Sequence, residues 1–260
     1  MSPTYRLDSV NRVYGNARSR VHAVADATFD VLDGQRLGIV GESGSGKSTL
    51  IRMMAALDRP TSGQLLFRGR DISHLPEKDL GDLRSSVQMV FQDPRSSLNP
   101  RMKVGDIITE PLRSPLLRQR ADVPTDRTER LREVMDQVGL PFSLRNRYPH
   151  EFSGGQRQRI AIARALSPKP DVLIADEPVS ALDVSVRAHV LNLLLDLVGE
   201  YGLTMLFVSH DLTVVRHVCD SVIVMHRGRI VEHGPIEEVY NDPRDDYTRT
   251  LLAAVPKIRV

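Results

Sequence analysis

Residues Gly41–Ser48 read GESGSGKS and satisfy the pattern G-x-x-x-x-G-K-[ST] in full. The apolar run Arg36–Val40 before them predicts a buried strand, and Ser48–Leu57 after them predicts a helix. Between a strand and a helix, glycines let backbone N–H groups turn inward around phosphate oxygens, and the helix N-terminus adds partial positive charge. The stretch therefore predicts a phosphate-binding loop in an α/β fold.

Lys47 and Ser48 carry the side-chain chemistry of this loop. Lys47 is expected to reach the β- and γ-phosphates of a nucleotide, and the Ser48 hydroxyl to bind Mg²⁺. A glycine-rich turn without a ligand is the alternative interpretation. The Lys-Ser ending and the flanking strand and helix argue against that alternative.

A second apolar run, Val172–Ala175, ends in the carboxylates Asp176 and Glu177. Ligands of open α/β sheets bind at the carboxyl ends of the strands. Asp176 is expected to hold Mg²⁺ through water, and Glu177 to polarise the attacking water as a general base. An ordinary acidic cap is the alternative, and the phosphate loop upstream favours the catalytic interpretation. Together the two stretches indicate a phosphate-loop NTPase, without saying which kind.

Bulk properties limit the remaining classes. The 260 residues are 41% hydrophobic and 26% charged, which suits one α/β domain, with or without an inserted subdomain. A net charge of +2, with Asp122 and other acids within the arginine-rich stretch Arg113–Arg132, predicts a solvated helical face and no nucleic-acid partner. The single cysteine, Cys219, excludes an internal disulfide and fits a reducing compartment. No apolar run is long enough to span a membrane, so we expect a chain that does not cross the bilayer by itself.

The chain is predicted to begin with short strands and turns, to become helical from about Asp93 to Pro149, and to return to an α/β rhythm after Pro170. Leu131, Val134, Met135 and Val138 mark one apolar helix face in the middle section, which indicates an inserted helical subdomain. Buried strands that alternate with helices predict a largely parallel sheet covered on both faces. The remaining expected strands are Tyr5–Val13, Val21–Val31, Gln64–Phe67, Thr204–Val208 and the hairpin Asp220–His226 with Arg229–Glu232, and the helices are Gly155–Leu166, Val184–Glu200 and Leu212–Val218.

A third motif lies between these two halves. Phe152–Arg159 reads FSGGQRQR, in which Ser153, Gly154 and Gly155 open a helix and offer a hydroxyl, free N–H groups and a helix dipole to an anion. A plain serine N-cap with flexible glycines is the alternative. The motif resembles the LSGGQ signature of ABC ATPases, and its place between the phosphate loop and the strand that carries Asp176 follows the order of that family.

The resemblance extends over essentially the whole chain and implies roles for further residues. Gln92 resembles the Q-loop glutamine, which contacts Mg²⁺ or the lytic water, and Asp183 closes a D-loop of the family (SALD) that crosses a dimer interface. His210 resembles the switch histidine that senses the γ-phosphate. Tyr14 stands near the place of the aromatic side chain that stacks on adenine. The residues implied to contact ATP are Tyr14, Gly41, Glu42, Ser43, Gly44, Ser45, Gly46, Lys47, Ser48, Thr49, Ser153, Gly154, Gly155, Gln156 and Asp183.

The family also implies a fold and its bounds. It is a P-loop NTPase with a RecA-like parallel-sheet core (1–92 and 157–235), an N-terminal antiparallel β subdomain, an inserted α-helical subdomain (93–156) and a C-terminal extension (236–260), all within one ABC ATPase domain. Glu177, His210, Gln92 and Lys47 are the implied catalytic residues, and Ser48, Gln92 and Asp176 the implied Mg²⁺ ligands.

Within the family, the chain is most similar to importer ATPases of the oligopeptide, dipeptide and nickel group. Three stretches carry this likeness: FQDPRSSLNP at Phe91–Pro100, DEPVSALDVSV at Asp176–Val186, and DYTRTLLAAVP at Asp246–Pro256. Two departures are visible. Asp245-Asp246 replace a His-Pro of the tail pattern, and the cysteines of a longer iron–sulfur tail are missing, so the chain resembles the shorter ATPase of the two that such transporters use.

The resemblance implies an ATP-hydrolysing motor at the cytoplasmic face of a membrane. Its partners would be a second cassette, identical or paralogous, two membrane permease subunits and, indirectly, an extracytoplasmic solute-binding protein. A soluble accessory ATPase of an enzyme complex, as in phosphonate breakdown, is the alternative. A DNA-repair or chromosome-type member is disfavoured, because the segment between Gln92 and Ser153 is too short and too interrupted by proline for a long coiled coil. The transported solute is not encoded in these motifs.

Overall fold

The structure is a computed structural model that describes residues 3–16, 19–117, 120, 123 and 126–254. Asp122 of the predicted solvated face and residues 255–260 of the predicted C-terminal extension lie outside the described residues. The chain divides into two compact units. We call residues 1–80 with 204–260 the phosphate-loop unit, and residues 81–203 the carboxylate unit. Each unit is described by itself.

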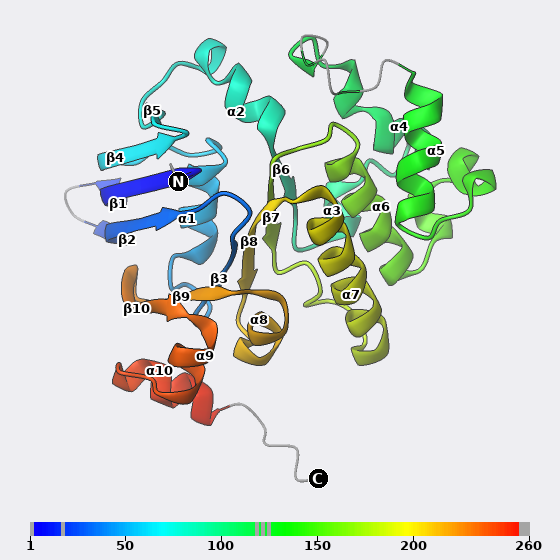
Figure 1. Cartoon of the computed structure of the whole chain (residues 1–260). Coiled ribbons are helices and arrows are strands. Elements are labelled where there is room, and N and C mark those ends of the chain that lie inside the picture. The colour runs from blue at the N-terminus through cyan, green and yellow to red at the C-terminus, as the bar shows by residue number, and fades with distance from the viewer. Residues whose placement is uncertain (1–2, 17–18, 118–119, 121–122, 124–125, 255–260) are drawn as a thin grey trace. The chain divides into compact units, whose positions relative to one another are not determined.

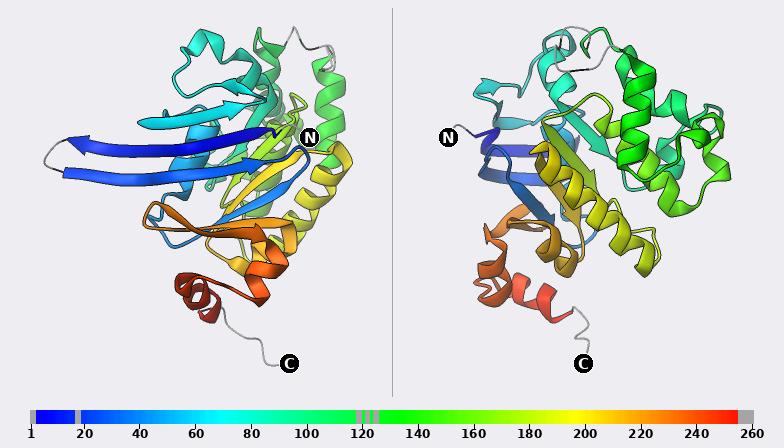
Figure 2. Two further views of the ribbon diagram at one scale, coloured as in Figure 1. Left: turned by 60° about the vertical axis from the view of Figure 1, so that its left-hand side comes forward. Right: turned by 45° about the vertical axis from the view of Figure 1, so that its right-hand side comes forward.

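The phosphate-loop unit contains an antiparallel sheet with the strand order β2-β1-β4-β5 (Figure 1). Its first two strands form a long ribbon, which Figure 2 shows from the side. They have 12 and 13 residues, so the predicted strands Tyr5–Val13 and Val21–Val31 are confirmed but longer than expected, because their pairing continues past Val13 as far as Asn16 and Ser19. The strands are β1 (Tyr5–Asn16), β2 (Ser19–Val31), β4 (Ser62–Phe67) and β5 (Arg70–Asp71).

A second set of strands in this unit holds the phosphate loop. β3 pairs in parallel with both β8 and β9, and β9 pairs antiparallel with β10. The middle residues of β3, β8 and β9 are buried and almost all apolar, as expected for strands covered on both faces. Their bounds are β3 (Arg36–Val40), β8 (Thr204–Ser209), β9 (Ser221–His226) and β10 (Arg229–Pro235).

Helices complete the core of this unit. α1 buries Leu50, Ile51, Met53 and Met54, and the Tyr5 hydroxyl donates to the Met54 carbonyl at 3.1 Å. The end of the unit folds as two short helices, α9 and α10, that follow β10 (Figure 1). The helical segments are α1 (Lys47–Met54), η1 (Glu77–Asp79), α8 (Leu212–Val218), α9 (Ile236–Asn241) and α10 (Asp246–Ala253).

The carboxylate unit is built around α6, which packs against α3, α4, α5, α7 and β6. The fully buried Arg130 of α5 donates to the carbonyls of Leu166 and Ser167 at 2.7 and 3.0 Å, which ties α5 to the C-terminal end of α6. The elements are α2 (Gly81–Ser86), β6 (Val87–Val90), α3 (Pro94–Ser97), α4 (Val104–Thr109), η2 (Pro111–Arg113), α5 (Arg127–Gln137), η4 (Phe142–Asn146), η5 (Pro149–Glu151), α6 (Gly154–Leu166), β7 (Val172–Asp176) and α7 (Val184–Tyr201).

Most predicted elements are confirmed to within a few residues, including β3, β7, β8, α7 and α8. Strand β6 was not predicted, because its four residues VQMV are too few for a period to be recognised. Among the described residues, no helix is long and apolar enough to span a membrane.

Candidate functional site

The phosphate loop has the backbone shape that its glycines predict. Gly41 has a φ of 151°, and a Cβ there would lie 2.2 Å from the Met225 carbonyl oxygen. Gly46 has a φ of 105°, and a Cβ there would lie 2.1 Å from the Ala23 carbonyl oxygen. Both conformations and both close approaches require glycine. The loop is therefore fixed by backbone packing against β2 and the end of β9.

Lys47 is the first residue of α1 and is only 5% exposed. Its ammonium group donates to the carbonyls of Gly41 and Glu42, both at 2.8 Å, so the charge is held over the loop. The Ser45 side chain is buried, and its backbone carbonyl accepts from the Gly228 N–H at 2.9 Å. The remaining predicted contacts lie open on the loop or the first helical turn: Ser43, Gly44 and Ser48 are exposed, and Thr49 is half-buried.

His210 lies at the same sheet edge as the phosphate loop. β3 and β8 are parallel, and their last residues, Val40 and Ser209, are register partners. Gly41 and His210 therefore follow neighbouring strand ends, as expected for a loop and a sensor that act on one ligand. His210 is exposed, and the hydroxyl of Ser209 accepts from the Asp211 N–H at 3.0 Å to begin α8.

Tyr14 lies near the end of β1 and is 38% exposed. Its hydroxyl donates to Asp58, and the Arg12 guanidinium lies 4.3 Å from the ring centroid. Partial burial raises the pKa of Asp58, but hydrogen bonds from Tyr14, the Arg59 backbone and Arg12 outweigh it, so this pKa lies below its usual value. The ring is thus anchored at its hydroxyl and remains partly open, and adenine stacking stays a prediction.

The carboxylate unit repeats the arrangement of aligned strand ends. β6 and β7 are parallel, with Val90 opposite Ala175, so Gln92 and Glu177 follow neighbouring strand ends. The Gln92 amide donates to a Glu177 carboxylate oxygen at 3.2 Å. Asp176 is buried at the end of β7, whereas Glu177 is half-buried with a φ of 45°. A positive φ at a residue other than glycine is strained and is concentrated at functional sites.

The signature motif forms a capping box at the start of α6. The Ser153 hydroxyl accepts from the Gln156 N–H at 3.3 Å, and the Gln156 side chain accepts from the Ser153 N–H at 3.0 Å. The serine N-cap that was weighed as the alternative is therefore present. It does not exclude anion binding, because the Ser153 hydroxyl proton and the exposed N-terminal turn remain available.

The two glycines of this motif have different reasons to be glycine. A Cβ at Gly155 would lie 2.4 Å from Val186 Cγ1, so packing of α6 against α7 explains it. A Cβ at Gly154 would lie 3.5 Å from Leu182 Cδ2, an ordinary contact, so space does not explain it. Asp183 lies at the N-terminus of α7 and is exposed, and its side chain makes no capping hydrogen bond.

The structure assembles two sets of predicted residues, one in each unit. The phosphate loop, Tyr14 and His210 belong to the phosphate-loop unit, and the other predicted residues to the carboxylate unit. Their union into one site stays a prediction. Sequence reasoning missed Tyr247 of α10, whose hydroxyl accepts from the Glu42 N–H at 3.0 Å. The only signal for it was the tail pattern, which carried no role.

The donor set of the predicted metal ligands fits Mg²⁺. Ser48, Gln92 and Asp176 offer hydroxyl, amide and carboxylate oxygens, which hard cations prefer. Among the described residues, no group of three or more His, Cys, Asp or Glu side chains could hold a metal ion. In nucleotide sites Mg²⁺ takes only a few protein oxygens, and phosphates and water supply the rest.

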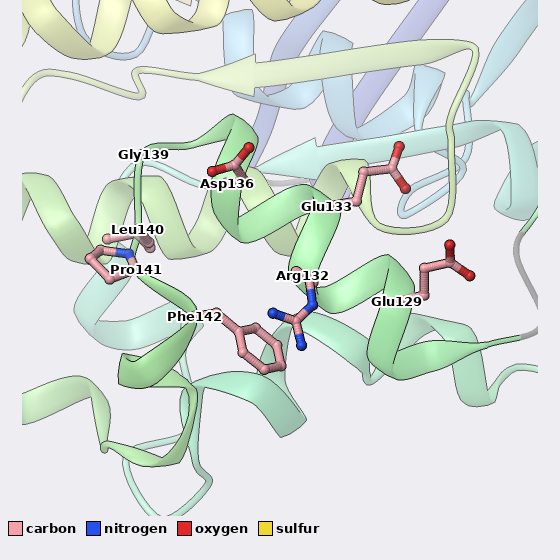
Figure 3. Close-up of a pocket in the computed structure, with 8 residues that line it drawn as sticks. All are labelled: Glu129, Arg132, Glu133, Asp136, Gly139, Leu140, Pro141 and Phe142. Carbon is pink, nitrogen blue, oxygen red and sulfur yellow. The ribbon is translucent and has the colours of Figure 1, made fainter.

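A cavity of about 660 Å³ lies away from these residues, between α5 and η4 of the carboxylate unit (Figure 3). The Arg132 guanidinium lies 4.1 Å from the Phe142 ring centroid. Three acidic residues of α5 also line the cavity: Glu129, Glu133 and Asp136. Glu129 and Arg132 belong to the stretch predicted to be a solvated face, and the lining as a whole carries both signs of charge.

Comparisons with known proteins agree with these motifs. A profile described as "ABC transporter" matches residues 24–180. The chain is 51% identical over 240 residues to the oligopeptide transport ATP-binding protein AppF of Bacillus subtilis, covering 92% of this chain and 72% of that protein. It is 47% identical over 239 residues to the dipeptide transport ATP-binding protein DppF of Haemophilus influenzae, with the same two shares.

Two solved structures are also similar. One is the dimeric, post-hydrolysis ATP-binding cassette MJ0796 bound to ADP and Pi, with a TM-score of 0.78 and 29% identity over 89% of this chain and 98% of that one. The other is CbiO1 of Clostridium perfringens, part of the transporter complex CbiONQ, with a TM-score of 0.79 and 28% identity over 99% of this chain and 98% of that one. The predicted fold and family are confirmed, and the chain belongs to the ABC transporter family.

Proposed function

We propose that this chain is the ATP-hydrolysing motor subunit of an importer for peptides or a related small solute. The observation that carries the proposal is the presence of both halves of a phosphate-loop ATPase at aligned strand ends in a chain about half identical to peptide transport ATP-binding proteins. The nature of the solute is supported by the names of those relatives alone.

Binding begins at the phosphate loop. Lys47 turns from the Gly41 and Glu42 carbonyls to the nucleotide phosphates, while backbone N–H groups and the start of α1 complete the cradle. Ser48, Gln92 and Asp176 are the residues that would hold Mg²⁺, which when bound neutralises charge on the phosphates. The buried stem of Lys47 limits its reach to the loop, and this favours one binding geometry.

Hydrolysis requires a positioned water. Glu177 accepts a proton from the water while the water oxygen attacks the γ-phosphorus. The bond from that phosphorus to the bridging oxygen of ADP then breaks. Gln92 holds the carboxylate through the 3.2 Å hydrogen bond and so orients the base. His210, which follows the strand end beside the phosphate loop, contacts the γ-phosphate and stabilises its charge.

The signature turn serves the nucleotide of a second cassette. Ser153, Gly154 and Gln156 are exposed at the N-terminus of α6, where unpaired N–H groups attract anions, and Asp183 is exposed at the end of the D-loop. Gly154 is small without a packing reason, which favours close approach of a ligand. Two cassettes, identical or paralogous, would enclose two ATP molecules head to tail and separate after hydrolysis.

The motor would act on two membrane permease subunits at the cytoplasmic face of the membrane. An extracytoplasmic solute-binding protein would deliver the solute to these subunits. The segment after Gln92, at the start of the helical subdomain 93–156, is the proposed contact with a permease helix. Residues 1–92 and 157–235 form the proposed core of the single ABC domain, and 236–260 its extension.

Purification of the tagged chain in mild detergent tests this proposal. We expect two integral membrane subunits and a second cassette in the complex, and ATPase activity that rises when the reconstituted complex receives peptide and its binding protein. Copurification with soluble enzyme subunits alone would instead establish the accessory-ATPase alternative and overturn the transport proposal.

A further inference from the structure

Tyr247, in the first turn of α10, connects the C-terminal end of the chain to the phosphate loop. Its hydroxyl accepts from the Glu42 N–H at 3.0 Å, and its ring stacks on His226 with centroids 3.9 Å apart and planes 2° from parallel. Burial raises the pKa of Tyr247 above its usual value, so the hydroxyl stays protonated at neutral pH. Tyr247 lies within the tail pattern DYTRTLLAAVP, which assigns it no role.

Tyr247 is itself held firmly in place. The Asp245 side chain accepts from the Tyr247 N–H at 2.8 Å as the cap of α10. The Glu232 carboxylate of β10 accepts from the backbone N–H groups of Arg244 and Asp245 at 2.8 and 3.1 Å. His226, against which the ring stacks, is the last residue of β9 and follows Met225, whose carbonyl approaches Gly41. The hydroxyl is thus presented to the loop by two strands and a capped helix.

The contact falls on one particular peptide group. The Glu42 N–H belongs to the same planar peptide as the Gly41 carbonyl, which accepts from Lys47 Nζ at 2.8 Å. Tyr247 therefore holds one end of this peptide and Lys47 the other. When Lys47 turns to a phosphate it releases the carbonyl end, and the hydrogen bond to Tyr247 still restrains the amide end of the peptide.

We propose that Tyr247 is a positioning residue for nucleotide binding: it fixes the Gly41–Glu42 peptide while Lys47 engages the phosphates, and so joins α10 to the phosphate loop. This inference rests on the proposed role of Lys47. It gives α10 a role in ATP binding, so a displacement of α10 would change the affinity of the phosphate loop for ATP.

Tyr247→Phe tests the proposal in the full chain, because it removes the hydroxyl and keeps the ring stacked on His226. Tyr240→Phe is the matched control, since Tyr240 lies in the neighbouring helix α9 with its ring under Arg216. Hydrogen exchange of the Glu42 amide is followed by NMR without nucleotide, and ATP affinity and turnover are measured on the same proteins.

In Tyr247→Phe we expect the Glu42 amide to exchange faster and the Kd for ATP to rise, each about threefold to tenfold for one lost hydrogen bond. The turnover number at saturating ATP should change less than the affinity, and Tyr240→Phe should behave as the parent. A Tyr247→Phe chain with parental exchange at Glu42 or parental affinity for ATP overturns the proposal, as does an equal rise in exchange at Ile39 in β3, which would indicate general loosening.

If the parent chain itself does not bind ATP, the proposed function fails. The exchange rate of the Glu42 amide is measured without nucleotide, so it still decides whether Tyr247 restrains this peptide.

Discussion

The candidate site of the phosphate-loop unit depends mainly on backbone geometry, whereas that of the carboxylate unit depends mainly on side chains. Both units place their groups after the aligned ends of two parallel strands. In the first, two glycines with positive φ pack against carbonyl oxygens, and Lys47 is buried over the loop. In the second, a hydrogen bond between two side chains joins the strand ends, from the exposed Gln92 to the half-buried Glu177. The shape of the first half is therefore set by its backbone, whereas that of the second depends on contacts between side chains.

Glu177→Gln separates the two halves most sharply. The substitution keeps an oxygen that can accept from Gln92 and removes the charge proposed to accept a proton from water. We expect turnover to fall by about 10²–10⁴-fold while Mg-ATP affinity stays near that of the parent. Single-turnover hydrolysis and equilibrium binding measure the two quantities. Glu200→Gln, at an exposed position of α7, is the control, and parental hydrolysis by Glu177→Gln would refute the assignment of the base.

Lys47→Ala should have the opposite effect and lower ATP affinity more than turnover. It removes the ammonium group proposed to bind the phosphates and leaves the strand ends of the carboxylate unit unchanged. We expect ATP affinity to fall by about 10–100-fold, as for the loss of hydrogen bonds to a charged group. Because Lys47 is buried, Lys47→Met is measured beside it to preserve the packing of the stem. Lys78→Ala, exposed in η1, serves as the control. Undiminished affinity in both Lys47 variants would place phosphate binding elsewhere.

Gln92→Ala tests how much the carboxylate unit depends on the hydrogen bond between Gln92 and Glu177. Glu177 would lose the 3.2 Å hydrogen bond that orients it at a strained φ of 45°. We expect turnover to fall about tenfold, the effect of one hydrogen bond on a barrier, with little change in ATP affinity. Gln88→Ala, in the preceding strand β6, controls for a lost amide at a position away from Glu177. Equal losses in both variants would show that the unit had been disturbed as a whole.

The difference between backbone-dependent and side-chain-dependent features also explains which parts of the site could be predicted from the sequence. The phosphate loop was predictable because its function depends on backbone shape, and backbone shape restricts residue type at Gly41 and Gly46. The signature turn was recognisable as a pattern, but only the structure separates Gly155, which packing explains, from Gly154, which it does not. Strand β6 was missed because four residues carry no clear period. Tyr247 was missed because its contact with Glu42 spans 205 positions, and no local pattern encodes such a contact.

The smallest expected effect concerns the support of strand β3. Arg36, its first residue, donates from Nε to Asp220 at 3.0 Å, and this hydrogen bond lowers the pKa of the Asp220 carboxyl. A lowered folded-state pKa gives stability that is present above the unfolded-state pKa and is lost as the pH falls through the folded-state pKa. Because the side chains are 38% and 50% exposed, Asp220→Asn should cost only about 0.2–1 kcal/mol at pH 7.

The difference between Asp220→Asn and the parent should vanish in strong acid, where Asp220 is protonated in both states, and should shrink in high salt. Denaturant unfolding at several pH values measures it. Asp106→Asn is the matched control in the carboxylate unit, where Arg113 and Asp106 are 3.4 Å apart and more than half exposed. If Asp106→Asn lost more pH-dependent free energy of unfolding than Asp220→Asn, the phosphate-loop unit would gain no more stability from its surface charges than the carboxylate unit. ATP affinity should be unchanged in both variants, because β3 is also held by its pairing with β8 and β9.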